Sequence, residues 1–425
     1  MAKDNVDRLK RLRAWVHNYD WGRCGTEAQV ARLLALNSGA EIKPDRPYAE
    51  FWMGTHDSGP SFLADANGEG VNVGLKDWIW KNPNVLGHKV LEKWGPDLPF
   101  LFKVLSVAKA LSIQAHPDKE LAKELHKLKP NLYKDANHKP EMALAITEFR
   151  ALCGFITLEE LKGVLVDVPE IVELVGTASA KQVLDIGKQD GAEKVKYALR
   201  SVFTQLMSAS KDMAMKATSN LKSRLHVESQ LRCLTEKERL VLHLEKQYPG
   251  DIGVISAFFF NYVKLNPGEA LYLGANEPHA YLSGECIECM ATSDNVVRAG
   301  LTPKHRDIQT LCSMLTYKQG YPDILKGFPM SQYITRYLPP FEEFEVDRCI
   351  LPKGASAVFP AIPGPSIFLV FLGKGTLRSG PWEDVVKEGD VLFAPSNTEI
   401  IIASPTSELQ LYRAGVNSGF IHAAL

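Results

Sequence analysis

Two short stretches of the sequence gather side chains that can do chemistry. The first, LSIQAHPDKE (111–120), places Gln114 and His116 two positions apart after an apolar run. The second, DANHKPEMA (135–143), holds His138, Lys139 and Glu141 within four positions. Imidazole, amide and carboxylate groups can bind a divalent metal, and histidine, lysine and glutamate can also transfer protons. We therefore expect a metal site or an acid–base site near these stretches.

Residue spacing favours the metal site. Residues i and i+2 of a strand face the same side, so Gln114 and His116 are expected to point together. If that side is a barrel interior, Glu141 and His279 can complete a set of two nitrogens and two oxygens. Zinc accepts such ligands, and a site open to water or substrate is the catalytic type. The plain alternative is that Gln114 and His116 only form hydrogen bonds within a polar strand.

An internal repeat connects His279 to a known motif. The two copies are NPGEALYLGANEPHAYL (266–282) and KEGDVLFAPSNTEIIIA (387–403); Gly268 aligns with Gly389, and His279 with Ile400. The first copy resembles the second motif of the cupin superfamily, in which the histidine binds a metal inside a small β-barrel. FLGKGTL (371–377) resembles the Gly-rich strand turn of cupins. The resemblance implies two barrels, of which the second has lost the metal histidine, and one metal per chain.

Further motifs are similar to those of the type I mannose-6-phosphate isomerase (phosphomannose isomerase) family. They are NYDWG (18–22), YAEFWMGTH (48–56), FLFKVLSV (100–107), LSIQAHPDKELA (111–122), DANHKPEMALA (135–145), ALCGF (151–155), QYPGDIG (247–253), PGEALYLGANEPHAYL (267–282) and ATSDNVVRAGLTPK (291–304). Beyond residue 304 only the cupin-like layout matches. The resemblance implies one zinc ion bound by Gln114, His116, Glu141 and His279, with Arg298 as a catalytic residue.

The same resemblance implies a reaction. An aldose–ketose isomerase of this family interconverts D-mannose 6-phosphate and D-fructose 6-phosphate through an enediol, and so supplies mannose 6-phosphate for GDP-mannose synthesis. Moving the proton between C2 and C1 needs a base and a nearby cation. Lys139 is one candidate base, because a divalent cation beside it favours the neutral amine. Glu288, on the strand after His279, is the other. A surface role or a phosphate-binding role for Lys139 stays open.

Other residues are candidates for assisting the reaction or binding the substrate. His138 can assist ring opening, or it can simply cap a loop. Asp294 and Arg298 are spaced i, i+4 and would pair on a helical turn, although an arginine also suits a phosphate or an enediolate. The candidate substrate-binding residues are Trp21, Lys103, Ser112, Tyr281 and Lys304.

Two other classes of protein can use the same residues. A cupin oxygenase would bind Fe(II) with His116, His279 and Glu141. A sugar-binding or storage cupin would bind without catalysis. Gln114 as a fourth ligand and the surplus of lysine and arginine around the site fit a phosphosugar better than the oxygenase. A binding protein would not need the extra basic and acidic side chains.

The elements that must position these residues are mainly strands. PFLFKVLSV (99–107) is typical of a buried strand, whereas TLEELKGVL (157–165) opens with a capping-box spacing between Thr157 and Glu160. We expect a mainly β protein with an α-helical insert, built from two cupin-like (jelly-roll) barrels and a helical domain. The expected parts are 1–151 (catalytic cupin domain, first part), 152–250 (helical insert), 251–326 (catalytic cupin domain, second part) and 327–425 (C-terminal cupin-like domain without metal ligands).

Composition excludes several classes of partner. The chain has 425 residues and a formal net charge of -1, which gives no reason to expect nucleic acid or an anionic membrane as a partner. The longest apolar run, 254–260, is too short to span a bilayer, and no Gly-rich phosphate loop indicates a nucleotide. Seven scattered cysteines are typical of reduced thiols, and the lone C-x-x-C at Cys286 and Cys289 is expected to be two buried strand residues. We expect a cytoplasmic monomer that acts on a small sugar phosphate.

Overall fold

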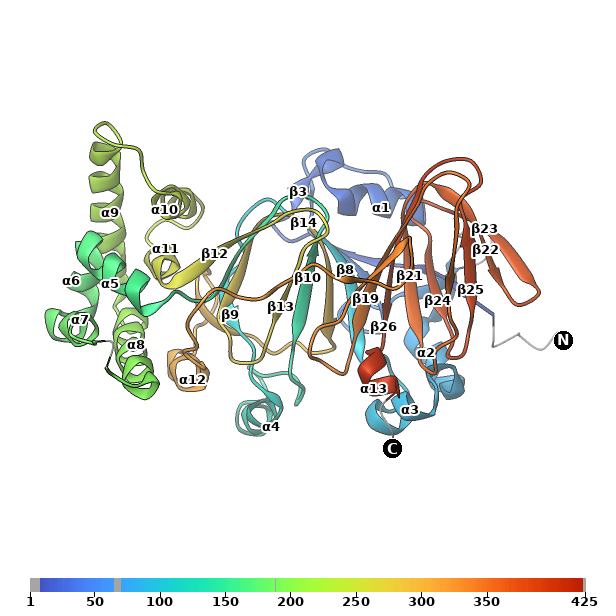
Figure 1. Cartoon of the computed structure of the whole chain (residues 1–425), viewed down its shortest axis with the longest axis horizontal. Coiled ribbons are helices and arrows are strands. Elements are labelled where there is room, and N and C mark those ends of the chain that lie inside the picture. Colours follow the sequence, from blue (N-terminus) through green and yellow to red (C-terminus); the bar gives the residue numbers. More distant parts are fainter. Residues whose placement is uncertain (1–7, 65–69, 188, 423–425) are drawn as a thin grey trace.

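The structure, a computed structural model, describes residues 8–64, 70–187 and 189–422. Figure 1 shows a group of helices at one end of the long axis, a β region in the middle and a second β region at the other end. The chain is thus rich in strands and contains a helical segment, as predicted. The closure of the strands into two cupin barrels stays a prediction.

The middle region is an eleven-stranded sheet that carries the site. Seven strands pair in the order β16 (Ile324–Leu325), β13 (Ala270–Leu273), β10 (Glu141–Ala145), β14 (His279–Ala291), β8 (Phe100–Val107), β5 (Glu50–Met53) and β2 (Trp15–His17). Four more strands join through β14: β11 (Phe149–Phe155), β12 (Phe260–Leu265), β9 (Ile113–Ala115) and β15 (Val297–Gly300). The buried strand predicted at 99–107 is β8, and Cys286 and Cys289 lie buried in β14 as predicted.

Strand β14 changes partners along its length. Its first residues pair with β11 and β9, and its later residues pair with β10 on one side and β8 on the other. The change falls at Gly284, whose φ of 112° is a conformation that side chains other than glycine rarely adopt. A Cβ at this position would lie 2.4 Å from the carbonyl oxygen of Glu148. The glycine therefore lets one long strand serve two sets of neighbours.

The helical segment follows β11 and ends before β12. Its helices are α5 (Leu158–Asp167), α6 (Pro169–Val175), α7 (Thr177–Leu184), α8 (Ala192–Met207), α9 (Lys211–Glu228), α10 (Glu236–Gln247) and α11 (Ile252–Ser256). The predicted capping box is present, since Thr157 and Glu160 each bond the other's backbone amide at the start of α5. Apolar residues of these helices form one buried cluster with Ile113, Phe155 and Phe260 of the sheet. No described helix is both long and apolar enough to cross a bilayer.

The second β region contains a nine-stranded sheet. Its order is β17 (Phe328–Pro329), β18 (Ile334–Tyr337), β19 (Glu345–Leu351), β26 (Leu409–Gly415), β21 (Ser366–Leu372), β24 (Val391–Ala394), β1 (Lys10–Arg13), β6 (Phe62–Ala64) and β7 (Gly70–Gly74). A four-stranded sheet, β20 (Ser356–Phe359), β25 (Ile400–Ala403), β22 (Lys374–Ser379) and β23 (Trp382–Lys387), completes the region, and residues of both sheets share one apolar core. Three N-terminal strands therefore extend the C-terminal sheet, which a division of the chain at residues 151 and 327 did not anticipate. The domain boundaries stay predictions.

Shorter elements connect or cover these sheets. They are α1 (Gln29–Ser38), α2 (Leu75–Lys81), α3 (His88–Trp94), α4 (Lys119–Leu128), α12 (Ile308–Met314), α13 (Ser418–His422) and the two-stranded pair of β3 (Arg23–Cys24) with β4 (Pro47–Tyr48). Helix α4 begins just after His116, and Asp118 caps it by accepting a hydrogen bond from the amide of Leu121 at 2.9 Å. The cap fixes the direction in which the chain leaves the site.

The two copies of the internal repeat form the same turn. Gly268 and Gly389 have φ values of 89° and 85°. In each copy the acidic residue after the glycine accepts a hydrogen bond from an amide three positions earlier, at 2.8 Å for Glu269 and 2.9 Å for Asp390. The first copy then leads to His279 at the start of β14, and the second to an isoleucine at the start of β25.

Candidate active site

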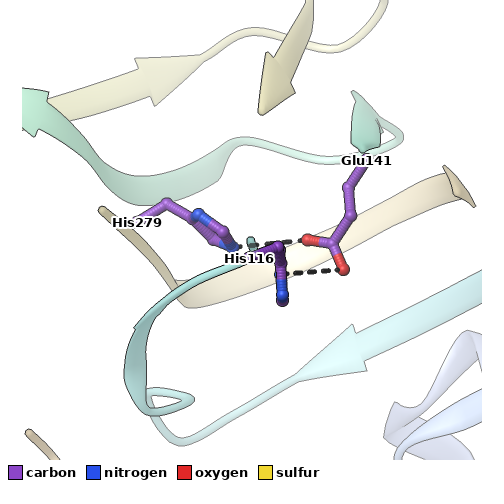
Figure 2. A group of neighbouring side chains, drawn as sticks. All are labelled: His116, Glu141 and His279. Atoms are coloured by element: carbon purple, nitrogen blue, oxygen red, sulfur yellow. Dashed lines mark ion pairs between the residues drawn. The ribbon is translucent and has the colours of Figure 1, made fainter. Parts of the chain in front are cut away.

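Two histidines and a glutamate come together at the eleven-stranded sheet (Figure 2). Glu141 begins β10, His279 begins β14, and His116 directly follows β9. His116 Nε2 lies 3.4 Å from Glu141 Oε1, and His279 Nε2 lies 3.3 Å from Glu141 Oε2. All three side chains are buried, and one potential ligand atom from each lies within 4.8 Å of the others. The group could hold one metal ion.

The hydrogen bonds of the two histidines show which ring nitrogens are available. His116 Nδ1 lies 2.7 Å from the carbonyl oxygen of Asn295, and His279 Nδ1 lies 3.0 Å from that of Glu277. A carbonyl only accepts, so each Nδ1 carries the proton and each Nε2 presents a lone pair. Both Nε2 atoms are buried without a hydrogen-bond partner. Two lone pairs and a carboxylate therefore face one another, an arrangement that a cation would satisfy.

Charge in the group is consistent with metal ligation. Burial lowers the pKa of His116 to about 4, so its imidazole is neutral. Burial alone would raise the pKa of Glu141. The ammonium of Lys139, 3.1 Å from Glu141 Oε1, nevertheless holds that pKa well below its usual value. A neutral imidazole and an ionised carboxylate are the forms that bind metals.

Gln114 lies beside this group because of strand register. Its Cα pairs with that of His279 on one side and that of Arg298 on the other. The Oγ of Ser112 donates a hydrogen bond to Gln114 Oε1 at 3.1 Å. The backbone thus brings the predicted fourth ligand next to His279, with its side chain on a cavity wall.

A cavity of about 390 Å³ opens in front of the metal group. It collects most of the residues that the sequence indicated: Trp21, Lys103, Ser112, Gln114, Lys139, Glu141, Tyr281, Glu288, Asp294, Arg298 and Lys304. His116 and His279 are buried and do not line it. The hydroxyl of Tyr281 is also buried and has no hydrogen-bond partner among the described residues. One compartment therefore combines a candidate metal group with several acids and bases.

A lysine between two glutamates forms one wall. Lys103 Nζ lies 2.8 Å from Glu288 Oε2 and 3.3 Å from Glu50 Oε2. Burial raises the pKa of Glu288, and its carboxylate neighbours raise it further, although Lys103 opposes both effects. Burial would lower the pKa of Lys103, but the two carboxylates raise it overall, so the ammonium stays charged. Glu288 is thus a carboxylate that accepts a proton more readily than usual.

Arg298 has no acidic partner among the described residues. It lies in β15, and no described side chain is within ion-pair or hydrogen-bond distance of its guanidinium. Burial alone lowers its pKa. The predicted pairing with Asp294 is wrong, because 297–300 is an extended strand rather than a helical turn. Asp294 Oδ1 instead lies 3.3 Å from His56 Nε2, and that contact lowers the pKa of Asp294.

The structure separates the two basic residues that precede Glu141. Lys139 lines the cavity and pairs with Glu141. His138 does not line it. Its Nε2 lies 2.7 Å from Oε1 of Glu343, a buried residue of the C-terminal region. The structure therefore does not bring His138 to the cavity beside the other candidates.

Three residues around the cavity were missed by sequence reasoning. Glu50, His56 and Glu343 each contact a residue that the sequence did single out, and Glu50 and His56 line the cavity themselves. Glu50 and His56 both lie in the stretch YAEFWMGTH. Its period-2 alternation could have placed Glu50 and Trp52 on one face. Nothing local indicated Glu343.

A buried His–Glu–His group beside a cavity lined with acids and bases defines a candidate metalloenzyme. Comparison with known proteins narrows this class. Residues 9–158 match the phosphomannose isomerase type I catalytic domain, and residues 174–260 match the helical insertion domain of that enzyme type. The chain belongs to the type I phosphomannose isomerase family and is an isomerase.

The sequences of individual relatives align with this chain over nearly its whole length. Mannose-6-phosphate isomerase 1 of Arabidopsis thaliana is 66% identical, over 97% of this chain and 95% of that protein. Mannose-6-phosphate isomerase of Bos taurus is 43% identical, over 96% and 99%. A crystal structure of a phosphomannose isomerase mutant from Salmonella typhimurium has a TM-score of 0.81 at 29% identity and covers 96% of this chain and 99% of that one. A mannose 6-phosphate isomerase bound with zinc and yttrium covers the same shares with a TM-score of 0.80 at 29% identity.

The metal group generates a direct prediction. We expect the metal-free protein to bind one divalent ion per chain, with Zn²⁺ as the probe. His279→Ala should weaken binding by roughly 100-fold or more, because it removes one of the few ligands that the protein supplies. Isothermal titration calorimetry on the metal-free proteins measures this. His226→Ala, an exposed position on α9, is the matched control and should bind as the wild type does. Equal affinity of the His279 variant would place the metal elsewhere.

Proposed function

We propose that this isomerase interconverts D-mannose 6-phosphate and D-fructose 6-phosphate with one Zn²⁺ at Gln114, His116, Glu141 and His279. One observation supports this proposal most: two buried imidazole nitrogens without a hydrogen-bond partner face Glu141. They lie beside a cavity that also contains Arg298, which has no acidic partner among the described residues. The names of its relatives and the zinc in a similar solved structure support the substrate and the metal.

The four candidate residues suit zinc in number and type. Two imidazoles, one carboxylate and one amide oxygen are ligands that zinc accepts. When bound, the ion would supply positive charge to stabilise negative oxygens of the substrate. The chain itself holds the histidines in the right tautomer through the carbonyls of Asn295 and Glu277. The second repeat has Ile400 in place of His279, which supports a single metal per chain.

Glu288 is our candidate for the residue that moves the proton between C2 and C1. It is buried, it lines the cavity, and its pKa is raised, so it can take up a proton and return it. Lys139, the rival base, pairs with Glu141 at 3.1 Å. We therefore assign Lys139 to holding Glu141, and to stabilising charge on the substrate.

The basic side chains of the cavity suit the phosphate and the enediolate. Arg298 and Lys304 line the cavity, and neither has an acidic partner among the described residues. A guanidinium donates two parallel hydrogen bonds to phosphate or carboxylate oxygens, and Ser112 adds a hydroxyl. Trp21 and Tyr281 provide aromatic surface for the sugar. Asp294, with His56 behind it, is our candidate for assisting ring opening. His138 is assigned to positioning the chain at Lys139.

The wider role follows from the product. Mannose 6-phosphate made by this reaction would feed the synthesis of GDP-mannose. A monomer in the cytosol, the expectation from composition, stays a prediction.

A coupled assay tests the proposal. The purified protein should convert mannose 6-phosphate to fructose 6-phosphate, lose this activity on chelation and regain it with added Zn²⁺. A bound divalent ion would contribute the largest single charge in the cavity, so its removal should abolish turnover. Full activity in a preparation shown by elemental analysis to be metal-free would end the zinc assignment. Oxygen consumption without ketose formation would favour an oxygenase, and binding without turnover a storage protein.

Arg298 generates a second prediction. Arg298→Lys keeps the charge but loses the planar pair of donors, so kcat/KM should fall by roughly a hundredfold or more. Folding should be normal, since Arg298 forms no ion pair that its loss would break. Steady-state kinetics, circular dichroism and metal content measure the three properties. Arg150→Lys, at a surface ion pair with Glu148, is the control and should keep normal kinetics. Normal kinetics in the Arg298 variant would remove this residue from the chemistry.

The pH dependence of the reaction tests Glu288. A carboxylate base works only when ionised, so kcat/KM should fall as the pH falls through the pKa of Glu288. Glu50→Gln removes a negative neighbour that raises this pKa, and the acid limb of the profile should therefore move to lower pH. Glu148→Gln, an exposed substitution, should leave the limb in place. If the acid limb of the Glu50→Gln profile does not move, or moves to higher pH, Glu288 is not the base.

A further inference from the structure

Two loops line part of the cavity, and we call this part its mouth. Residues 109, 111 and 112 of the first loop and residues 301–304 of the second line the cavity. The first loop carries Lys109 and Ser112. The second follows Arg298 and carries Lys304. The candidate anion-binding side chains therefore depend on the conformation of two segments that are not regular strands or helices.

The end of the helical segment holds the first loop. Gln247, the last residue of α10, accepts a hydrogen bond from the amide of Ala110 at 3.0 Å. The hydroxyl of Tyr248 donates to the carbonyl oxygen of Ala110 at 2.5 Å. The ammonium of Lys109 lies 4.6 Å from the centre of the Tyr248 ring. Both backbone groups of Ala110 are thus bonded to the helical segment.

Asp251 holds the second loop. Its Oδ1 accepts hydrogen bonds from the amides of Leu301 and Gly253, each at 2.7 Å, and its Oδ2 accepts one from the amide of Thr302 at 3.2 Å. Leu301 has a φ of 52°, which is costly for a residue other than glycine. The carboxylate therefore stabilises a turn that the loop would not favour by itself.

The same turn is packed tightly against the helical segment. A Cβ on Gly300 would lie 2.5 Å from the Cα of Gly253, and a Cβ on Gly253 would lie 2.4 Å from the amide nitrogen of Leu301. Only two glycines allow the backbones to approach this closely. The end of β15, which carries Arg298, and the start of α11 are therefore fixed relative to each other.

Sheet topology does not require the helical segment. It lies between β11 and β12, which are antiparallel neighbours paired from Phe149↔Leu265 to Phe155↔Phe260. Two such strands can be joined by a loop of two to five residues, roughly. Residues 156–259 connect the two strands instead, and the final part of this segment contacts both loops at the mouth of the cavity.

We propose that the helical segment serves the active site by positioning its anion-binding mouth, with Asp251 and Tyr248 as positioning residues. This inference rests on the proposed function, because it takes the phosphate of the sugar as the anion. The carboxylate of Asp251 accepts hydrogen bonds from three backbone amides of the protein, so its charge is used within the chain. Lys304 and Arg298, on either side of the turn, have no acidic partner among the described residues. The turn therefore presents two unpaired cations to the same ligand.

Kinetics with sugar phosphate and binding of inorganic phosphate test this role. Asp251→Ala should raise KM for mannose 6-phosphate and the dissociation constant of inorganic phosphate by about tenfold or more, because three amides lose their acceptor. The turnover number and the zinc content should change much less. Asp251→Asn keeps one acceptor oxygen and should recover part of the loss. Ser210→Ala, which removes the cap of α9 and contacts neither loop, should behave as the wild type does.

The outcomes are separable. Tyr248→Phe removes one hydrogen bond and keeps the ring, so it should fold even if Asp251→Ala does not. It should raise KM for mannose 6-phosphate and the dissociation constant of phosphate by roughly threefold or more.

Unchanged constants in a folded variant would overturn the positioning role, as would equal losses of turnover and zinc. If the wild type binds phosphate but does not isomerise, the proposed function fails. Phosphate binding to the wild type and the variants, measured by calorimetry, still decides the role of the helical segment.

Discussion

The site depends on the register of β14. This strand places His279 against Gln114 of β9, Glu288 against Lys103 of β8, and Met290 against Glu141 of β10. A slip of one residue would turn each of these side chains to the opposite face of the sheet. The change of partners at Gly284 keeps both halves of the strand in register with their own neighbours. One backbone ladder therefore holds both the candidate metal group and Glu288, the base in our proposal.

Electrostatics then divides the charged side chains of the cavity into two sets. Lys103 lies between Glu50 and Glu288, and Lys139 pairs with Glu141, so most of the charge is balanced within the protein. Arg298 and Lys304 have no acidic partner in the part of the chain that the structure describes. Leaving an arginine largely buried and unpaired costs free energy unless a ligand compensates it. The imbalance identifies the side of the cavity where an anionic group of the substrate binds in our proposal.

Local patterns in the sequence predicted those features of the fold and of the candidate site that depend on local geometry. The Gln114–His116 spacing, the turn before His279 and the capping box at Thr157 each follow from interactions within a few residues. Long-range pairing could not be predicted in this way. Glu50 reaches Lys103 only because β5 pairs with β8, and Glu343 reaches His138 from the far end of the chain. The expected pairing of Asp294 with Arg298 failed for the same reason, because strand β15 overrode the helical spacing.

The position of β1 affects the order in which the protein can fold. Strand β1 lies between β24 and β6 in the nine-stranded sheet, so residues 10–13 pair with residues 391–393 on one side and 62–64 on the other. During synthesis β1 can pair with β6 early, but its other edge must wait until residues 391–393 have left the ribosome. Such distant contacts slow folding and leave strand edges exposed in the meantime. The edge of β1 that faces β24 is therefore open to aggregation, and to chaperones, until residues 391–393 are made.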